Sequence, residues 1–246
     1  FVFDHNGLWR LHDRDRNGEA DYHELFCSII DQTAETREFG AAIEVEKDGS
    51  FLVCKPGQTS STVGRFSSAI LRISPDGQRV TRLAHGFRQP YLGYDPVTGQ
   101  IAASDQQGHY VPSTPVDFVR QGAFYGHPNG SADKDKLVTP PLTWIPHQEC
   151  GSAAAVIWLR DTKMGPLGDQ PILLSFNPPR LFQIHADVDE FVLPAARPAA
   201  SCLEWVGSMR HCQSPDACMP AWPSASAMPA PSRPHNFAAA AAAPNT

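Results

Sequence analysis

A stretch near the start of the chain, Asp13–Glu24, matches the pattern D-x-[DN]-x-[DN]-G-x5-E at every specified position. Calcium is a hard cation that takes about six to eight oxygen ligands, and this spacing brings carboxylate, amide and carbonyl oxygens around one point. Gly18 permits the tight turn that this arrangement needs. The expected calcium ligands are Asp13, Asp15, Asn17, the carbonyl of Glu19, Asp21 and the bidentate carboxylate of Glu24.

The segments that flank this loop are Gly7–Leu11 and Glu24–Ile30, which are short and rich in strand-forming residues. We therefore expect the loop to join two strands, and not the two helices of an EF-hand. A calcium ion held there would have a structural role. The alternative is an acidic, solvated β-turn with Asn-Gly at its tip.

A second group of residues that could carry chemistry lies between Gly86 and Pro128. Turn residues alternate here with short β-prone runs, such as Gln100–Ser104 and Val116–Val119, at a density typical of a β-propeller blade and the loops above it. The stretch contains three short motifs, Gly86-Phe87-Arg88-Gln89-Pro90, Ser104-Asp105-Gln106-Gln107-Gly108 and Phe124-Tyr125-Gly126-His127-Pro128.

In their order and spacing these motifs resemble those of the glucose/sorbosone dehydrogenase-like propellers, which are soluble quinoproteins, and especially the branch named as membrane-bound dehydrogenases in planctomycetes. The resemblance runs from about Leu8 to about Ile184. It implies oxidation of a sugar or alcohol by pyrroloquinoline quinone, held by calcium over the top of the propeller. By position, the planar charged fork of Arg88 would contact the quinone oxygens or carboxylates. The residues placed where the family holds the cofactor and its calcium are Gln107, Gly108 and His109.

Arg88 could instead brace a loop, and two departures from the family pattern bear on activity. Gln89 follows the arginine where the soluble glucose dehydrogenases have Asn, and the segment that should carry a general-base histidine, 37–40, contains none. Oxidation of an alcohol carbon needs a group that accepts the hydroxyl proton. Glu38 could do so only if burial raised its pKa, and we expect it to be solvated. No catalytic residue is assigned, and the candidates are Glu38 and His109.

Turn signals predict the fold class. Asp48-Gly49, Pro75-Asp76-Gly77 and Asp95–Gly99 each separate two strand-like segments, and the first and last lie about fifty residues apart, which is in the range of one propeller blade. A further pair of strands is expected over Gln170–Ile184. The chain is predicted to be all-β and to form an incomplete β-propeller of four-stranded blades, with a β-sandwich as the competing architecture.

Composition predicts the domain organisation. Residues 1–193 are expected to form the propeller fragment, 194–219 to be sequence of uncertain relation to it, and 220–246, rich in Pro, Ala and Ser, to be a disordered tail. The chain begins with Phe inside a strand-like run, so we interpret it as a fragment without its targeting signal. The six cysteines show no spacing typical of zinc or haem sites and predict no disulfide pairing.

A net charge of -6 without a basic cluster argues against a nucleic-acid partner, and no apolar run is long enough to span a membrane. Two hypotheses for function remain. The first is a quinoprotein-like oxidoreductase, periplasmic or secreted as the family resemblance implies, which acts on a small sugar or alcohol and passes electrons to a protein partner. The second is a non-catalytic, calcium-braced propeller that binds a glycan or a protein.

Overall fold

The computed structural model describes residues 1–30, 38, 40–57, 64–106, 111–127, 136–160 and 167–185, together with the backbone of 186 and 200–204. No α-helix occurs in these ranges, and therefore none in them is long and apolar enough to cross a membrane. The strands are β1 (Val2–Asp4), β2 (Gly7–His12), β3 (Tyr22–Cys27), β4 (Ile43–Val45), β5 (Phe51–Lys55), β6 (Ala69–Ile73), β7 (Val80–His85), β8 (Pro90–Tyr94), β9 (Ile101–Asp105), β10 (Ser113–Phe118), β11 (Thr143–Pro146), β12 (Ser152–Trp158), β13 (Pro171–Asn177), β14 (Arg180–Ala186) and β15 (Ala200–Glu204).

The strands form four antiparallel sheets in which each strand pairs with the next one along the chain. We name them sheet A (β1-β2-β3), sheet B (β4-β5-β6-β7), sheet C (β8-β9-β10-β11) and sheet D (β12-β13-β14-β15). The turn signals correctly predicted the β4–β5, β6–β7, β8–β9 and β13–β14 hairpins. The chain is thus all-β, and its described residues form three four-stranded sheets and one of three strands.

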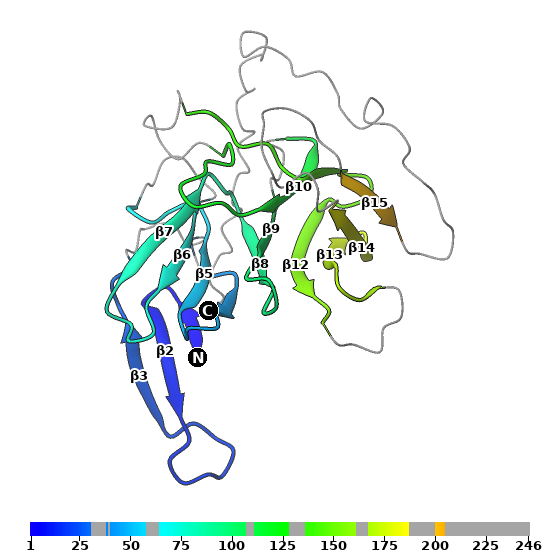
Figure 1. Cartoon of the computed structure of the whole chain (residues 1–246). Coiled ribbons are helices and arrows are strands. Elements are labelled where there is room, and N and C mark those ends of the chain that lie inside the picture. The colour runs from blue at the N-terminus through cyan, green and yellow to red at the C-terminus, as the bar shows by residue number, and fades with distance from the viewer. Residues whose placement is uncertain are drawn as a thin grey trace, which may run out of the picture.

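The sheets pack face to face in chain order, as Figure 1 shows from the blue hairpin of sheet A to the yellow-green strands of sheet D. Successive side chains of β5 point to opposite faces of sheet B, which explains how this sheet packs against both sheet A and sheet C. Phe51 and Val53 join the apolar cluster shared with sheet A, whereas Leu52 and Cys54 join the cluster shared with sheet C. A strand buried on both faces belongs in the interior of a stack and not on one side of a β-sandwich.

The first strands of sheets B, C and D lie next to one another, because β8 contacts both β4 and β12. Radial stacking of up-and-down sheets, with their first strands adjacent, is the arrangement of a β-propeller. The fold prediction of a partial propeller is therefore confirmed. The predicted disordered tail, 220–246, lies outside the described residues, and the predicted boundary at 193 stays a prediction. β15, which lies beyond that boundary, pairs with β14 in sheet D.

The side chains of three of the six cysteines are described, and all three are buried free thiols. Cys54 and Cys150 lie in the clusters between sheets B and C and between sheets C and D, and Cys27 lies between sheets A and B. They serve as small apolar side chains in the core.

Candidate functional site

The described parts of the three motifs meet at one end of sheets B and C. Asp105, the last residue of β9, is fully buried and accepts hydrogen bonds from the backbone N–H groups of Arg88 (2.7 Å) and Gln89 (2.6 Å). The first motif thereby lies against the second. We call this arrangement, Gly86–Gln89 with Asp105 and His127, the motif hub.

His127 joins the third motif to the hub. Its backbone N–H donates to the carbonyl of Gly86 (2.8 Å), and its Nε2 lies 2.7 Å from the carbonyl oxygen of Gly57. The N–H of Gly57 in turn donates to the carbonyl of Arg88 (3.0 Å). Gly86 has a φ of +89°, and a Cβ there would lie 2.5 Å from the Phe124 ring, so only glycine fits between the motifs. His127 thus holds the turn of the third motif against the first motif and Gly57.

The Arg88 side chain is half-buried at the rim of the hub. Its Nη1 donates to the backbone carbonyl of Gln106 (2.9 Å) and to the Oε1 of the same residue. The guanidinium therefore braces Gln106, the residue that follows β9. The predicted cofactor-binding residues Gln107, Gly108 and His109 lie outside the described residues.

Two buried carboxyl groups give the hub unusual electrostatics. Burial raises the pKa of Asp105 to about 6, although the hydrogen bonds from Arg88 and Gln89 and the charge of Arg88 act to lower it. Burial, together with the neighbouring Asp105 carboxyl, raises the pKa of Asp117 on β10 well above its usual value. The Oδ2 of Asp117 accepts no hydrogen bond from any described residue. Both groups favour their neutral forms over most of the acidic pH range.

The expectation that Glu38 is solvated was wrong. The residue is 2% exposed; its carboxylate forms an ion pair with Lys55 (3.2 Å) and accepts a hydrogen bond from the Ser67 hydroxyl (2.7 Å). The reason is Lys55, whose ammonium is itself buried at the end of β5 and needs a counter-charge there. A carboxylate held in this way is poorly placed to accept a proton from a substrate.

Asp105 and Lys55 are the site residues to which sequence reasoning gave no role. The signal for Lys55 was present, since it ends the otherwise apolar run Phe51–Cys54 and a charge in that position is rarely left without a partner. Asp105 belonged to a recognised motif, but only the structure shows that its carboxylate caps two backbone amides of another motif.

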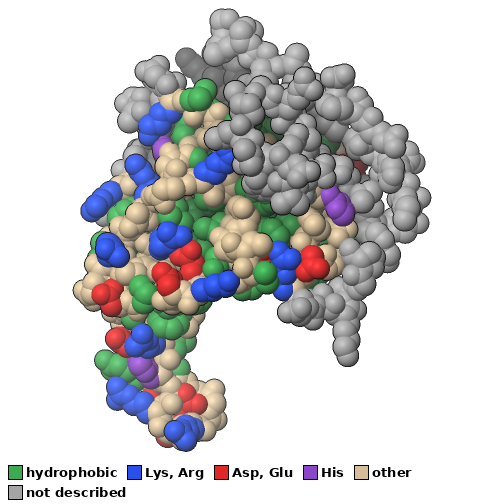
Figure 2. Space-filling model, in the orientation of Figure 1, with side chains coloured by type: hydrophobic (Ala, Val, Ile, Leu, Met, Phe, Trp, Pro, Cys, Tyr) green, Lys and Arg blue, Asp and Glu red, His purple; other side chains and the backbone are tan. Residues whose placement is uncertain are grey.

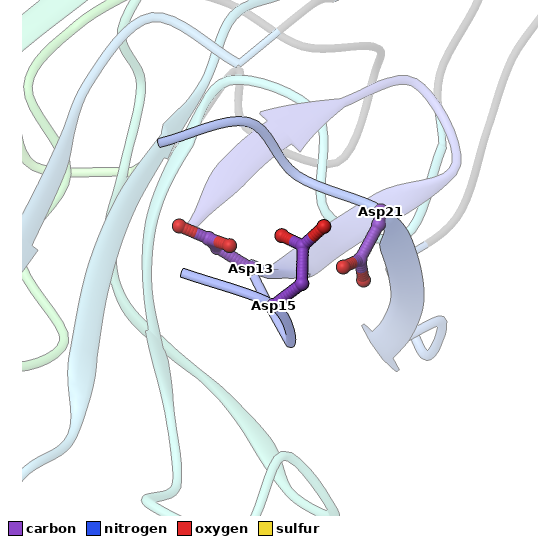
Figure 3. A group of neighbouring side chains, drawn as sticks. All are labelled: Asp13, Asp15 and Asp21. Atoms are coloured by element: carbon purple, nitrogen blue, oxygen red, sulfur yellow. The ribbon is translucent and has the colours of Figure 1, made fainter. Parts of the chain in front are cut away.

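Residues 13–21, which we call the acidic loop, join β2 and β3, as predicted. The loop lies at the tip of a hairpin that projects from the body of the molecule (Figure 1). Figure 3 shows Asp13, Asp15 and Asp21 as neighbours in the loop, and one carboxylate oxygen of each lies within 4.8 Å of the others. All three side chains are exposed. The structure thus brings together three of the six predicted calcium ligands.

Backbone amides hold the loop in shape. Asp13 accepts hydrogen bonds from the N–H groups of Gly18 (2.9 Å) and Asn17 (3.1 Å), and these donors keep the pKa of Asp13 below its usual value. Gly18 has a φ of +94°, which explains the need for glycine at this position. These bonds and the positive φ of Gly18 explain the shape of the loop from its own backbone.

The other predicted ligands are placed differently. The Oδ1 of Asn17 accepts the backbone N–H of Glu19 (2.8 Å), so its side chain stays within the loop. Glu24 lies on β3, where its Oε2 is 2.8 Å from the Nε2 of His12 and 3.7 Å from the Nη1 of Arg10. Glu24 would have to leave these partners to complete a calcium site.

Comparison with solved structures finds a glucose dehydrogenase that superimposes on 79% of this chain and 68% of its own length, with a TM-score of 0.56 and 12% sequence identity. The PQQ-bound aldose sugar dehydrogenase of Streptomyces coelicolor aligns over 64% of this chain, with a TM-score of 0.46 and 17% identity. The chain covers 47% of that enzyme, about half its length. No family model and no curated protein matches the sequence. At these identities the likeness to the glucose dehydrogenase shows a shared fold.

Proposed function

We propose that this chain is part of a quinoprotein-like oxidoreductase that acts on a sugar or alcohol. The observation that carries the proposal is the meeting of the three family-like motifs around Arg88 and Asp105. The shared fold with a glucose dehydrogenase supports it. In this proposal the protein is periplasmic or secreted, its substrate is a small sugar or alcohol, and an electron-transfer protein accepts the electrons.

The fit of pyrroloquinoline quinone rests on Arg88. Its guanidinium is planar and permanently charged, and its backbone is fixed by Asp105, so it can present N–H donors to carboxylate or quinone oxygens. When bound, the quinone would supply the two-electron acceptor for alcohol oxidation. The chain's own contribution would be to bind and orient it, with Arg88 and the loop residues Gln107, Gly108 and His109 in that role.

Arg88→Ala is expected to weaken binding of pyrroloquinoline quinone by at least about tenfold while the protein stays folded. The fold should survive because Asp105 bonds the backbone amide of Arg88, which alanine retains. Isothermal titration of the quinone, with calcium and then with a chelator, measures the effect. Arg79→Ala, which removes an exposed arginine outside the hub, is the matched control.

Equal affinity of the wild type and Arg88→Ala would remove Arg88 from the cofactor site. No binding by folded wild-type protein would favour the second function, a non-catalytic propeller that binds a glycan or protein. One observation already favours that alternative: the Glu38 carboxylate, at the place of the family's general-base histidine, is bonded to Lys55 and Ser67.

In either case we propose that the acidic loop binds calcium. Calcium should raise the melting temperature of the wild type, because a ligand that binds only the folded state stabilises it by about 2.7 kcal/mol at a hundred times its Kd. Asp15→Ala should abolish this rise, as measured by thermal unfolding with calcium or chelator. Glu19→Ala is the control, since it removes one charge from the same loop but leaves the proposed carbonyl ligand in place. If calcium has no effect on the wild type, or if both variants lose the response equally, the assignment is wrong.

A further inference from the structure

An open pocket of about 480 Å³ lies beside β7, outside the motif hub. Three segments that are distant in sequence form its walls: residues 82–85 at the end of β7, 122–124, and 136–139. Its volume lies within the range typical of small-molecule sites, about 300–1,000 Å³. In Figure 2 Lys and Arg side chains gather on the side of the molecule where β7 lies.

Backbone hydrogen bonds hold the walls together, so the pocket is preformed. The N–H of His85 donates to the carbonyl of Ala123 (3.1 Å), and the N–H of Gly122 donates to the carbonyl of Leu83 (2.6 Å). The third wall is attached through the N–H of Thr139, which donates to the carbonyl of Phe124 (2.7 Å). A preformed site loses little conformational entropy when a ligand binds.

The charged residues among the described lining of the pocket are basic. Arg82 and Lys136 line it together with His85, and no aspartate or glutamate is among its described lining residues. The Arg82 guanidinium is exposed and forms no ion pair with any residue that the structure describes. The chain as a whole carries a formal charge of -6, so basic side chains in this described lining contrast with its average composition.

The positions of Lys136 and His85 are fixed by contacts with each other and with Phe124. The Nζ of Lys136 lies 2.7 Å from the Nε2 of His85, close enough for the ammonium to donate to a neutral imidazole. The Lys136 ammonium also lies 5.9 Å from the centre of the Phe124 ring, and the His85 and Phe124 rings are 5.1 Å apart. The buried His85 and Phe124 rings thus hold the Lys136 ammonium on one side, whereas Arg82 and the rest of Lys136 are exposed.

We propose that this pocket binds a small molecule through an oxyanion group, a carboxylate or a phosphate. A guanidinium fork matches the two oxygens of such a group, and the Lys136 ammonium provides a second positive charge in the lining of the same pocket. The volume leaves room for a body the size of a monosaccharide behind the anionic group. The site is independent of the quinone proposed above.

Titration of purified protein with glucuronate, inorganic phosphate and glucose tests this directly. We expect saturable binding of glucuronate, phosphate or both, weaker as ionic strength rises, and no binding of neutral glucose in the pocket. Arg82→Gln should weaken anion binding by about tenfold, because the substitution removes a charged donor and leaves the backbone of β7 unchanged. Arg79→Gln, which removes the same charge outside the pocket, should bind the anion as the wild type does.

Binding of glucuronate alone would identify the group as a sugar carboxylate, and binding of phosphate alone would identify it as a phosphate. Lys136→Gln provides a second variant with the same expected loss if Arg82→Gln fails to fold, as judged by circular dichroism. Absence of binding by the folded wild type, or equal loss in Arg79→Gln and Arg82→Gln, would overturn the proposal. No arm of the experiment uses quinone, so its result does not depend on the function proposed above.

Discussion

Asp105→Ala should lower the free energy of unfolding by about 4 kcal/mol, because each buried N–H left without an acceptor costs about 1–3 kcal/mol. The carboxyl group of Asp105 accepts the backbone N–H groups of Arg88 and Gln89, and the residue is fully buried, so water cannot replace it. Asp105→Asn should lose about half as much, since the amide oxygen can still accept one N–H. Urea unfolding at pH 5 measures both losses.

The difference in unfolding free energy between the wild type and Asp105→Asn should depend on pH. Burial raises the pKa of Asp105 from 3.8 to about 6 in the folded protein. The stability linked to this shift is fully present below about pH 4 and is lost as the pH rises through 6, by about 3 kcal/mol in all. Asparagine cannot ionise, so the gap between the wild type and Asp105→Asn should narrow from pH 4 to pH 7.

Asp76→Ala is the control, because Asp76 also accepts a backbone N–H but is exposed. We expect this substitution to lower the free energy of unfolding by no more than about 1 kcal/mol. Equal losses in Asp105→Ala and Asp76→Ala would contradict the assigned role of Asp105. A gap between wild type and Asp105→Asn that stays constant or widens with pH would contradict the raised pKa.

Local patterns were enough to predict the elements of the fold. Turn dipeptides such as Asp48-Gly49 fix the backbone within a few residues, and the strands on either side alternate or run apolar because both faces of sheet B are buried. The acidic loop was predictable for the same reason. All of its expected ligands lie in one short segment, Asp13–Glu24, and three of its carboxylates lie close together in the structure.

Interactions between distant segments could not be predicted in this way. Glu38 looked like a solvated glutamate because nothing near it in sequence shows that Lys55, 17 residues away, is buried beside it. Three separate segments form the pocket beside β7, and no motif around Arg82 or Lys136 in the sequence indicates a binding site. Burial and cross-sheet pairing are properties of the packed sheets, so the charges that pair there were assigned only once the structure was known.

The ion pair between Asp95 and Arg160 illustrates such pairing and should make the second large contribution to stability. Asp95 follows β8, Arg160 follows β12, and the two residues are 65 positions apart in sequence. The Asp95 carboxylate is fully buried; it accepts the Nε–H of Arg160 (2.9 Å), the N–H of Val97 (3.0 Å) and the N–H of Thr98 (3.3 Å). It thereby joins sheet C to sheet D.

Asp95→Ala is expected to cost about 3–5 kcal/mol, because removing one partner leaves buried donors and a partly buried guanidinium without an acceptor. Burial acts to raise the pKa of Asp95, but the bonds from Arg160 and Thr98 outweigh it and hold that pKa well below 3.8. The stabilisation is therefore present above about pH 4 and is lost as the pH falls below it. Urea unfolding of Asp95→Ala, Arg160→Ala and the double variant should give a coupling energy of about 1–3 kcal/mol.

Asp169→Asn is the matched control for this pair. Asp169 also contacts Arg160, at 3.0 Å, but its side chain is 78% exposed, and an exposed ion pair contributes only about 0–1 kcal/mol. Asparagine suits its φ of +67°, so the substitution removes the charge without adding backbone strain. If Asp169→Asn were as destabilising as Asp95→Ala, the stabilisation would come from the charge of Arg160 and not from burial of its partner. A coupling energy near zero between Asp95 and Arg160 would mean that the turn after β8, and not the link between the two sheets, is what Asp95 stabilises.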